Sequence, residues 1–255
     1  MLLFPMERLV VLCTPKCGST SVHQAYAPYA AVVLGGHPRL KHLRFARYER
    51  GIAPLVGSDI GSLETVCIIR DPVAHLRSWY RYLRGRNRDG FSGTHHDQTY
   101  EHFVEAFLDP KTDFRIRTQH AFLEDEASDI GVNRIFALKH IDRFVCFMNE
   151  RLRVRVSLPV MNISSGESPT LSTELAERLR ERLAPDIALY EAVLNAEDGW
   201  KNPDRRFEAH TKPRKGMTAM ESANQYVQRA KRVRKSSLAV AKLKRAFQQM
   251  VGSRP

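Results

Sequence analysis

Two segments of this 255-residue sequence combine the residue types that bind phosphate. The first, TPKCGSTS at residues 14–21, follows the apolar run 8–13. If a helix begins at Gly18, its first amide groups point at a bound anion and its macrodipole favours negative charge there. Lys16 adds a mobile positive charge, although it precedes the glycine, unlike the lysine of the GxxxxGKS/T loop. An ordinary serine-capped helix after a strand is the alternative. The predicted phosphate ligands are Thr14, Lys16, Cys17, Gly18, Ser19, Thr20 and Ser21.

The second segment is RDPVAHLRS at residues 70–78, after the apolar run 65–69. Pro72 suits the first turn of a helix, so Arg70 would stand at the end of a strand. There its guanidinium can form two parallel hydrogen bonds to a phosphate, and Ser78 can donate another. The alternative is that Asp71 caps the helix and Arg70 forms a surface ion pair. We predict that Arg70 and Ser78 bind a second phosphate.

Short apolar runs alternate with amphipathic segments along the chain. This alternation predicts an α/β fold with a central parallel sheet. The predicted strands are 8–13, 65–69 and 134–138, with a shorter one at 32–34. Predicted helices begin at Gly18 and Pro72 and cover 43–51, 100–108, 116–123, 141–152 and 172–194, the last with Pro185 as a candidate break.

Positive charge is concentrated at one end of the chain. The formal net charge is +12, and residues 206–255 hold 13 Lys and Arg against two Asp and Glu. We therefore predict a domain at 1–205 and a basic, helical extension at 206–255. Such an extension indicates an anionic partner, such as a membrane surface, although a solvated basic helix would have the same composition. The sequence shows no membrane-spanning run and no signal-peptide pattern, and its four cysteines have no CxxC spacing, so we expect a cytoplasmic protein.

In order and spacing, these segments resemble the sulfotransferase superfamily that uses 3′-phosphoadenosine 5′-phosphosulfate (PAPS). PKCGSTS resembles the family's 5′-phosphosulfate loop, and Arg70-Asp71-Pro72 with Ser78 resembles its 3′-phosphate motif. The order of HLRFARYERG, VCII and RDPVAHLRSWYRYLRG is similar to that in heparan-sulfate and uronyl 2-O-sulfotransferases, and LPVMNISSG is similar to the family's Asn-Ser loop. One departure is Lys139, where many relatives carry an acidic residue.

The resemblance implies a P-loop-like, three-layer α/β/α domain at 1–205. It implies transfer of a sulfuryl group from PAPS to a hydroxyl, in these relatives that of a carbohydrate, with PAP as the product and no metal required. In the family a basic loop commonly closes over the nucleotide, and Arg214-Lys215-Gly216 resembles that loop. Lys212, Arg214 and Lys215 are therefore further candidate ligands of the cofactor.

In-line transfer to a hydroxyl needs a group that stabilises the leaving group and a base that takes the hydroxyl proton. Lys16 is the candidate for the first role. A neutral imidazole suits the second role, because it accepts a proton near neutral pH. His42 begins the segment that resembles the one with the catalytic histidine of the 2-O-sulfotransferases, and His37 and Asp59 are the alternatives.

Two other classes of function remain open from the sequence. A small-molecule kinase uses the same strand–loop–helix arrangement, but it would need an acidic residue that binds Mg²⁺ and a fuller glycine loop. A non-enzymatic protein would bind polyanions through the basic extension, with strong salt dependence. We expect no specific nucleic-acid partner.

Overall fold

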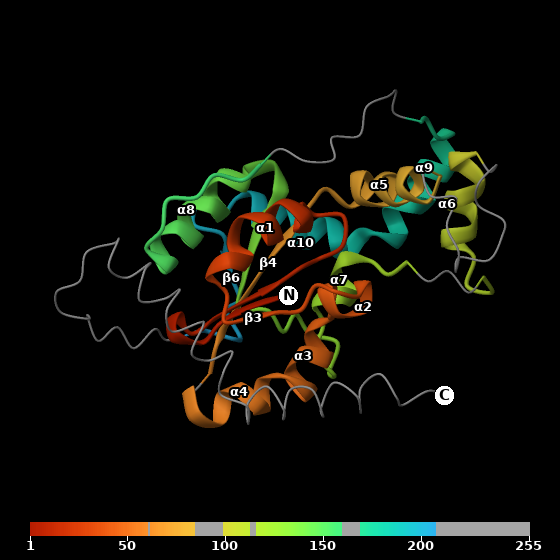
Figure 1. Ribbon diagram of the computed structural model, residues 1–255. Coiled ribbons are helices and arrows are strands. Elements are labelled where there is room, and N and C mark those ends of the chain that lie inside the picture. The colour runs from red at the N-terminus through yellow and green to blue at the C-terminus, as the bar shows by residue number, and fades with distance from the viewer. Residues whose placement is uncertain (61, 85–98, 113–115, 160–168, 208–255) are drawn as a thin grey trace.

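A computed structural model describes residues 1–60, 62–84, 99–112, 116–159 and 169–207, apart from the side chains of residues 57–60 (Figure 1). Within these residues the chain forms an α/β fold around one mixed sheet of six strands. Almost all of the predicted basic extension lies outside the described residues, including Lys212, Arg214 and Lys215.

The centre of the sheet consists of the three predicted long strands. The sheet has the strand order β3-β1-β2-β4-β5-β6. Its central strands run parallel to one another and are β2 (Leu9–Leu12), β4 (Glu64–Ile69) and β5 (Arg134–Ala137). Its other strands pair antiparallel and are β1 (Leu2–Phe4), β3 (Val32–Val33) and β6 (Trp200–Lys201). β3 agrees with the short strand expected at 32–34, whereas β1 and β6 were not predicted.

The sheet is parallel, as predicted, only at its three central strands, and its other three strands pair antiparallel. β1 and β2 are joined by the short 3-10 helix η1 (Pro5–Glu7). Parallel neighbours need a crossover of a dozen or more residues, so a connection this short can only form an antiparallel pair. At the other edge, β6 returns from the last described helix and pairs with the first two residues of β5.

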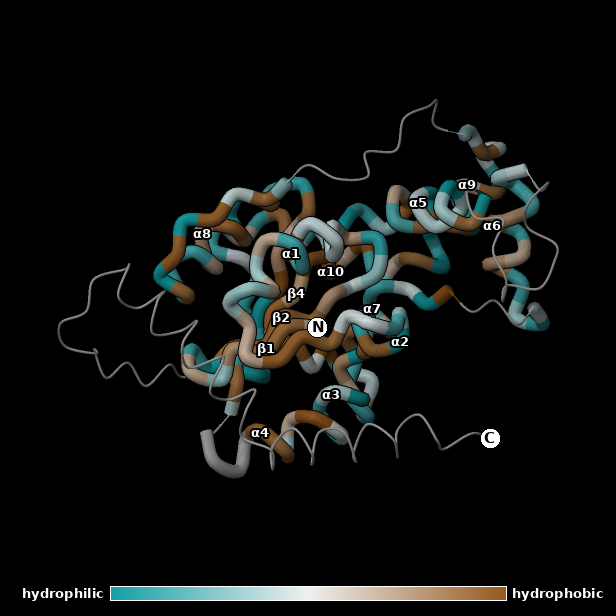
Figure 2. Tube along the Cα trace, viewed as in Figure 1, coloured by the Kyte–Doolittle hydropathy of each residue, from teal (hydrophilic) through white to brown (hydrophobic). Residues whose placement is uncertain are grey.

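Helices cover both faces of the sheet, because alternate residues of the central strands enter two separate cores (Figures 1 and 2). On one face, Val10 and Cys67 share a core with residues of α3 (Phe45–Gly51), α7 (Gln119–Leu123) and α10 (Ala184–Leu194). On the other face, Val11 and Val66 share a core with residues of α1 (Ser19–Tyr26) and α8 (Ile141–Leu152).

A third apolar cluster lies beside the sheet and is formed mainly by three helices (Figure 1). Its helices are α5 (Pro72–Arg84), α6 (Tyr100–Leu108) and α9 (Thr173–Arg182). The helix predicted at 172–194 divides at Leu183 into α9 and α10, and Pro185 occupies the first turn of α10, as expected of a proline break. The remaining short helices are α2 (Pro38–Lys41), α4 (Ala53–Ile60), η2 (Ala27–Tyr29) and η3 (Leu138–His140).

A buried ion triad ties β4 to its neighbours at the amino end of the strand. Only 3% of the Glu64 side chain is exposed, and its oxygens lie 2.8 Å from Arg134 Nε and 3.0 Å from Arg151 Nη2. Arg134 belongs to β5 and Arg151 to α8, so the triad joins the sheet to one helical layer. Loss of one member leaves the other charges partly desolvated and without a counterion.

We expect Glu64→Gln to lower the free energy of unfolding by about 2–3 kcal/mol, because the two arginines lose their shared counterion but remain partly solvated. The matched control is Glu126→Gln, since Glu126 pairs with Arg50 where both side chains are largely exposed. That change should cost less than about 1 kcal/mol. Urea unfolding of both variants measures the difference, and equal losses would contradict the role given to the triad.

Candidate functional site

The two predicted phosphate segments meet where the three parallel strands end. Residues 13–18, the 13–18 loop, connect β2 to α1, and Arg70 directly follows β4. η3 follows β5 and packs against this loop, because a Cβ built on Gly18 would lie 3.2 Å from Leu138 Cδ1. In open α/β sheets, ligands bind outside the carboxyl ends of the parallel strands. The meeting point of the two segments is therefore the candidate site.

The 13–18 loop has a left-handed backbone at two positions. The φ angle is 60° at Lys16 and 74° at Gly18. Glycine adopts such an angle without strain, whereas a residue with a Cβ is strained by roughly 1–2 kcal/mol. Turns that contain left-handed residues bring successive amide groups toward one point, which creates a concave surface that binds anions. The strain at Lys16 therefore accompanies a shape suited to phosphate or sulfate.

Side chains from three other elements hold carbonyl groups of the 13–18 loop. A carbonyl oxygen can only accept a hydrogen bond, so each of these side chains is the donor. The three hydrogen bonds are His42 Nδ1 to the Cys13 carbonyl at 2.6 Å, His75 Nε2 to the Pro15 carbonyl at 3.0 Å and Arg70 Nη1 to the Lys16 carbonyl at 3.3 Å. With its carbonyl groups held in this way, the loop keeps amide groups for a ligand.

The amide groups at the start of α1 are the donors that this arrangement leaves open. Within the described part of the chain, the amides of Gly18, Ser19 and Thr20 form no hydrogen bond. They lie at the amino end of an eight-residue helix, whose dipole favours an anion. The side chains of Thr14 and Cys17 are buried; the Cys17 thiol donates to Gln119, and the Thr14 hydroxyl has no hydrogen-bond partner among the described residues.

The hydroxyl groups of the first turn of α1 differ in accessibility. Ser19 and Ser21 are buried, and Thr20 is exposed. The Thr20 hydroxyl accepts a hydrogen bond from Lys41 Nζ at 3.3 Å. Lys41 therefore adds a second lysine beside the start of α1, which the sequence reasoning did not include.

Arg70 is held at the junction of the two segments. Gln119, from the first turn of α7, binds both backbone groups of Arg70, and the Arg70 side chain reaches the 13–18 loop. Its Nε is buried and has no hydrogen-bond partner among the described residues, so the guanidinium retains a donor for a ligand. Asp71 accepts a hydrogen bond from the Ala74 amide at 2.7 Å. Asp71 thus caps α5, as the alternative interpretation proposed, while Arg70 forms no surface ion pair among the described residues.

One face of α5 lies along the 13–18 loop. His75 contacts the Pro15 carbonyl, and the Lys16 ammonium lies 4.0 Å from the centroid of the Tyr82 ring. Residues three or four apart share a helix face, so Ser78 lies on this face between His75 and Tyr82. The predicted ligand Ser78 therefore faces the same loop as Arg70.

His42 has the protonation state that a base requires. Burial and the positive charges of Lys41, the amino terminus and Lys16 lower its pKa to about 4, against the opposing effect of its hydrogen bond to Cys13. The ring is thus neutral at pH 7, and its proton lies on Nδ1, which donates to the Cys13 carbonyl. The lone pair is on Nε2, which has no hydrogen-bond partner within the described residues.

The other candidate bases, and the neighbouring histidine His23, are placed differently. His37 is exposed, and its Nδ1 accepts a hydrogen bond from the Arg39 amide, so it caps α2. His23 lies 3.2 Å from the amino-terminal nitrogen, and burial is the largest of the causes that lower its pKa to about 3. Asp59 lies in α4, where its side chain is outside the described set.

His75 is a second site residue, besides Lys41, that sequence reasoning missed. Its side chain is buried, and burial lowers its pKa to about 4. The sequence spacing could have revealed it. His75 lies three residues before Ser78 in a predicted helix, so it shares the helix face that carries this predicted phosphate ligand.

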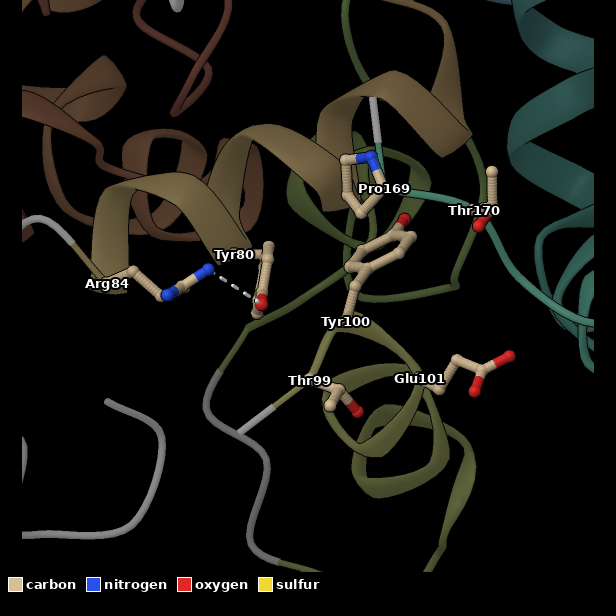
Figure 3. A pocket seen from close by; sticks show the side chains of 7 residues that line it. All are labelled: Tyr80, Arg84, Thr99, Tyr100, Glu101, Pro169 and Thr170. Atoms are coloured by element: carbon tan, nitrogen blue, oxygen red, sulfur yellow. Dashed lines mark hydrogen bonds between the residues drawn. The ribbon is translucent and has the colours of Figure 1, made fainter. Parts of the chain in front are cut away.

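A cavity of about 480 Å³ lies elsewhere, between α5, α6 and the segment before α9 (Figure 3). Tyr80 and Arg84 form its α5 wall, and Arg84 donates a hydrogen bond to the Tyr80 hydroxyl. Each is two residues from Tyr82 and therefore points to the opposite side of the helix. The cavity is thus separated from the 13–18 loop by α5, and no residue of the loop lines it.

Comparisons with protein-family models, with curated proteins and with solved structures found no match. Among the described residues, no three His, Cys, Asp or Glu side chains gather so that they could hold a metal ion. No helix in those same residues is long and apolar enough to cross a membrane.

We expect the free energy of unfolding to fall as the pH drops from about 6.5 toward 4. The pKa of His75 is lowered to about 4 in the folded chain, so in this interval the unfolded state binds more protons and gains stability. His42 contributes in the same direction. His75→Gln should make the decline shallower by up to about 3 kcal/mol over the interval.

Urea unfolding at a series of pH values measures this decline. The control is His102→Gln, because His102 is exposed on α6. The assignment of His75 fails if its variant and the control keep the same pH dependence as the unaltered chain.

Proposed function

We propose that this chain is a PAPS-dependent sulfotransferase that transfers a sulfuryl group to a hydroxyl of a carbohydrate. The observation that carries the proposal is the 13–18 loop, whose carbonyl groups are held by His42, His75 and Arg70 while amides at the start of α1 remain open. Beside it stands a second anion-binding pair, Arg70 and Ser78. Two such centres side by side fit a nucleotide with one phosphate at each end of its ribose.

The residues present fit PAPS by the chemistry of their donors. In this proposal the amides of Gly18, Ser19 and Thr20, with Lys16, hold the 5′-phosphosulfate, and Arg70 and Ser78 hold the 3′-phosphate. The donor supplies the sulfuryl group and a nucleotide phosphate as the leaving group. Lys16 neutralises the charge that develops on that leaving group. A P-loop-like relationship of the fold belongs to this proposal and agrees with the β2–loop–α1 arrangement.

His42 takes the proton of the acceptor hydroxyl in this proposal. Its hydrogen bond to the Cys13 carbonyl fixes the proton on Nδ1 and leaves Nε2 as the basic atom. The pKa of about 4 makes His42 a weak base that is unprotonated at neutral pH. Such a base acts as the oxygen–sulfur bond forms, when the hydroxyl proton becomes acidic.

Positive charge near His42 supports an anionic acceptor. Arg44 lies two residues after His42 and directly precedes α3, which contacts α7. Partial burial lowers the pKa of Arg44, and the charges of Arg117 and Arg47 lower it further, so the three guanidinium groups lie close together. A carboxylated or sulfated carbohydrate would relieve this repulsion.

A cytoplasmic location is part of the same proposal. Cys13, Cys17 and Cys67 are buried free thiols beside the site, and Cys146 is an exposed free thiol on α8. Free thiols are usual in a reducing compartment.

We expect PAP to raise the melting temperature without magnesium and ATP with magnesium to have no effect. Arg70→Ala should weaken PAP binding about 10–100-fold, because a hydrogen bond to a charged group contributes about 1.5–3 kcal/mol. Arg50→Ala is the control, since Arg50 is exposed and paired with Glu126. Thermal shift and calorimetric titration provide the measurements, and stabilisation by ATP with magnesium but not by PAP would favour a kinase.

We expect His42→Asn to lower turnover of labelled PAPS about 10²–10⁴-fold, the usual effect of removing a general base. Asparagine can still donate to the Cys13 carbonyl, so PAP affinity should change far less than turnover. His37→Asn should lower turnover much less, because asparagine also caps a helix. A larger loss of turnover in the His37 variant would contradict the assignment of His42 as the base.

A further inference from the structure

Gln119 connects the two phosphate segments through one buried carboxamide. It is the first residue of α7, and only 2% of it is exposed. Burial of an amide is costly unless its donor and acceptor are satisfied, so the partners of this group define what it does.

Two of its hydrogen bonds hold the backbone of Arg70. Gln119 Nε2 donates to the Arg70 carbonyl at 2.8 Å, and Gln119 Oε1 accepts from the Arg70 amide at 2.9 Å. The ladders of β4 end before this residue, at Cys67 toward β2 and at Ile69 toward β5. The carboxamide therefore binds Arg70 where a neighbouring strand would otherwise pair with it. In this way it continues the backbone hydrogen bonding of β4 by one residue.

A third hydrogen bond holds the 13–18 loop. The Cys17 thiol donates to Gln119 Oε1 at 3.2 Å. Burial raises the pKa of this thiol to about 12, so the sulfur keeps the proton that it donates. One oxygen atom of Gln119 thus joins Cys17, between the left-handed residues Lys16 and Gly18, to the amide of Arg70.

We propose that Gln119 is a positioning residue that locks the 13–18 loop and Arg70 into one geometry, so that the two phosphate centres act as a unit. It touches no ligand and acts through Arg70 and Cys17. The nature of the ligand rests on the proposed function, but the locking itself can be measured in the chain without any ligand.

Asn133 provides a matched control at the other end of β4. Its Oδ1 accepts from the Thr65 amide at 2.8 Å and from the Thr65 hydroxyl at 2.7 Å, and its Nδ2 donates to the Arg205 carbonyl. Asn133→Leu therefore removes a similar bridging amide that binds β4 at its amino end, far from the candidate site.

The first test is hydrogen–deuterium exchange of the full chain without nucleotide. Gln119→Met should speed exchange in the peptides that contain residues 14–18 and 70–71, whereas Asn133→Leu should leave these peptides as in the unaltered chain. Gln119→Glu keeps the acceptor oxygen but loses the donor to the Arg70 carbonyl, so its effect should be intermediate. The Gln119→Glu variant also replaces Gln119→Met in this test if the methionine variant does not fold. Unchanged exchange in the Gln119 variants, or equal acceleration in Asn133→Leu, overturns the proposal.

The second test is calorimetric titration with PAP. Gln119→Met should weaken binding about tenfold, equivalent to one hydrogen bond to a charged group. In an Arg70→Ala background the same change should have a much smaller effect, because a residue that acts through Arg70 loses its influence once Arg70 is gone. Equal effects in both backgrounds overturn the coupling to Arg70. If the unaltered chain does not bind PAP, the proposed function fails, and the exchange experiment still decides the role of Gln119.

Discussion

The hydrogen bonds that hold the carbonyl groups of the 13–18 loop are the interaction on which the candidate site depends. A short connection between a strand and a helix has carbonyl groups as well as amides, and it binds an anion only if the amides face inward. His42, His75 and Arg70 come from three different elements, and each holds one carbonyl. Each bond is worth about 0.5–1.5 kcal/mol, so the three together offset the roughly 1–2 kcal/mol of strain at Lys16. The loop is therefore shaped before a ligand arrives.

The sheet supplies the frame that makes this arrangement possible. Three parallel strands place the 13–18 loop, Arg70 and η3 together at their carboxyl ends. Antiparallel strands flank them on both sides of the sheet. Burial of the central strands on both faces fixes their register, because a slip would exchange the side chains of the two cores. The sheet fixes the positions of the backbone segments at the site. The side chains that hold these segments come from α5, α7 and the end of α2.

Much of this frame could be predicted from the sequence, but the contacts at the site could not. β2, β4 and β5 follow from continuous apolar runs, which is how strands buried on both faces appear in a sequence. β1 escaped prediction because Pro5 ends its apolar run after Phe4, and β6 because Trp200–Lys201 contains a single apolar residue. The candidate phosphate ligands were recognisable from their types and spacing. The contacts that hold them join residues such as Cys17 and Gln119, which are 102 positions apart, and only the fold brings such pairs together.

The distribution of the cysteines has a consequence for experiments on this protein. Cys13, Cys17 and Cys67 are buried, and Cys146 alone among the four is exposed. A nearby carboxylate, Glu150, raises the pKa of the Cys146 thiol, so the group reacts slowly near neutral pH and faster in mildly alkaline solution. A thiol-directed dye therefore reaches Cys146 on α8 before the three buried thiols. The chain thus contains its own position for a fluorescent reporter, without any engineered substitution.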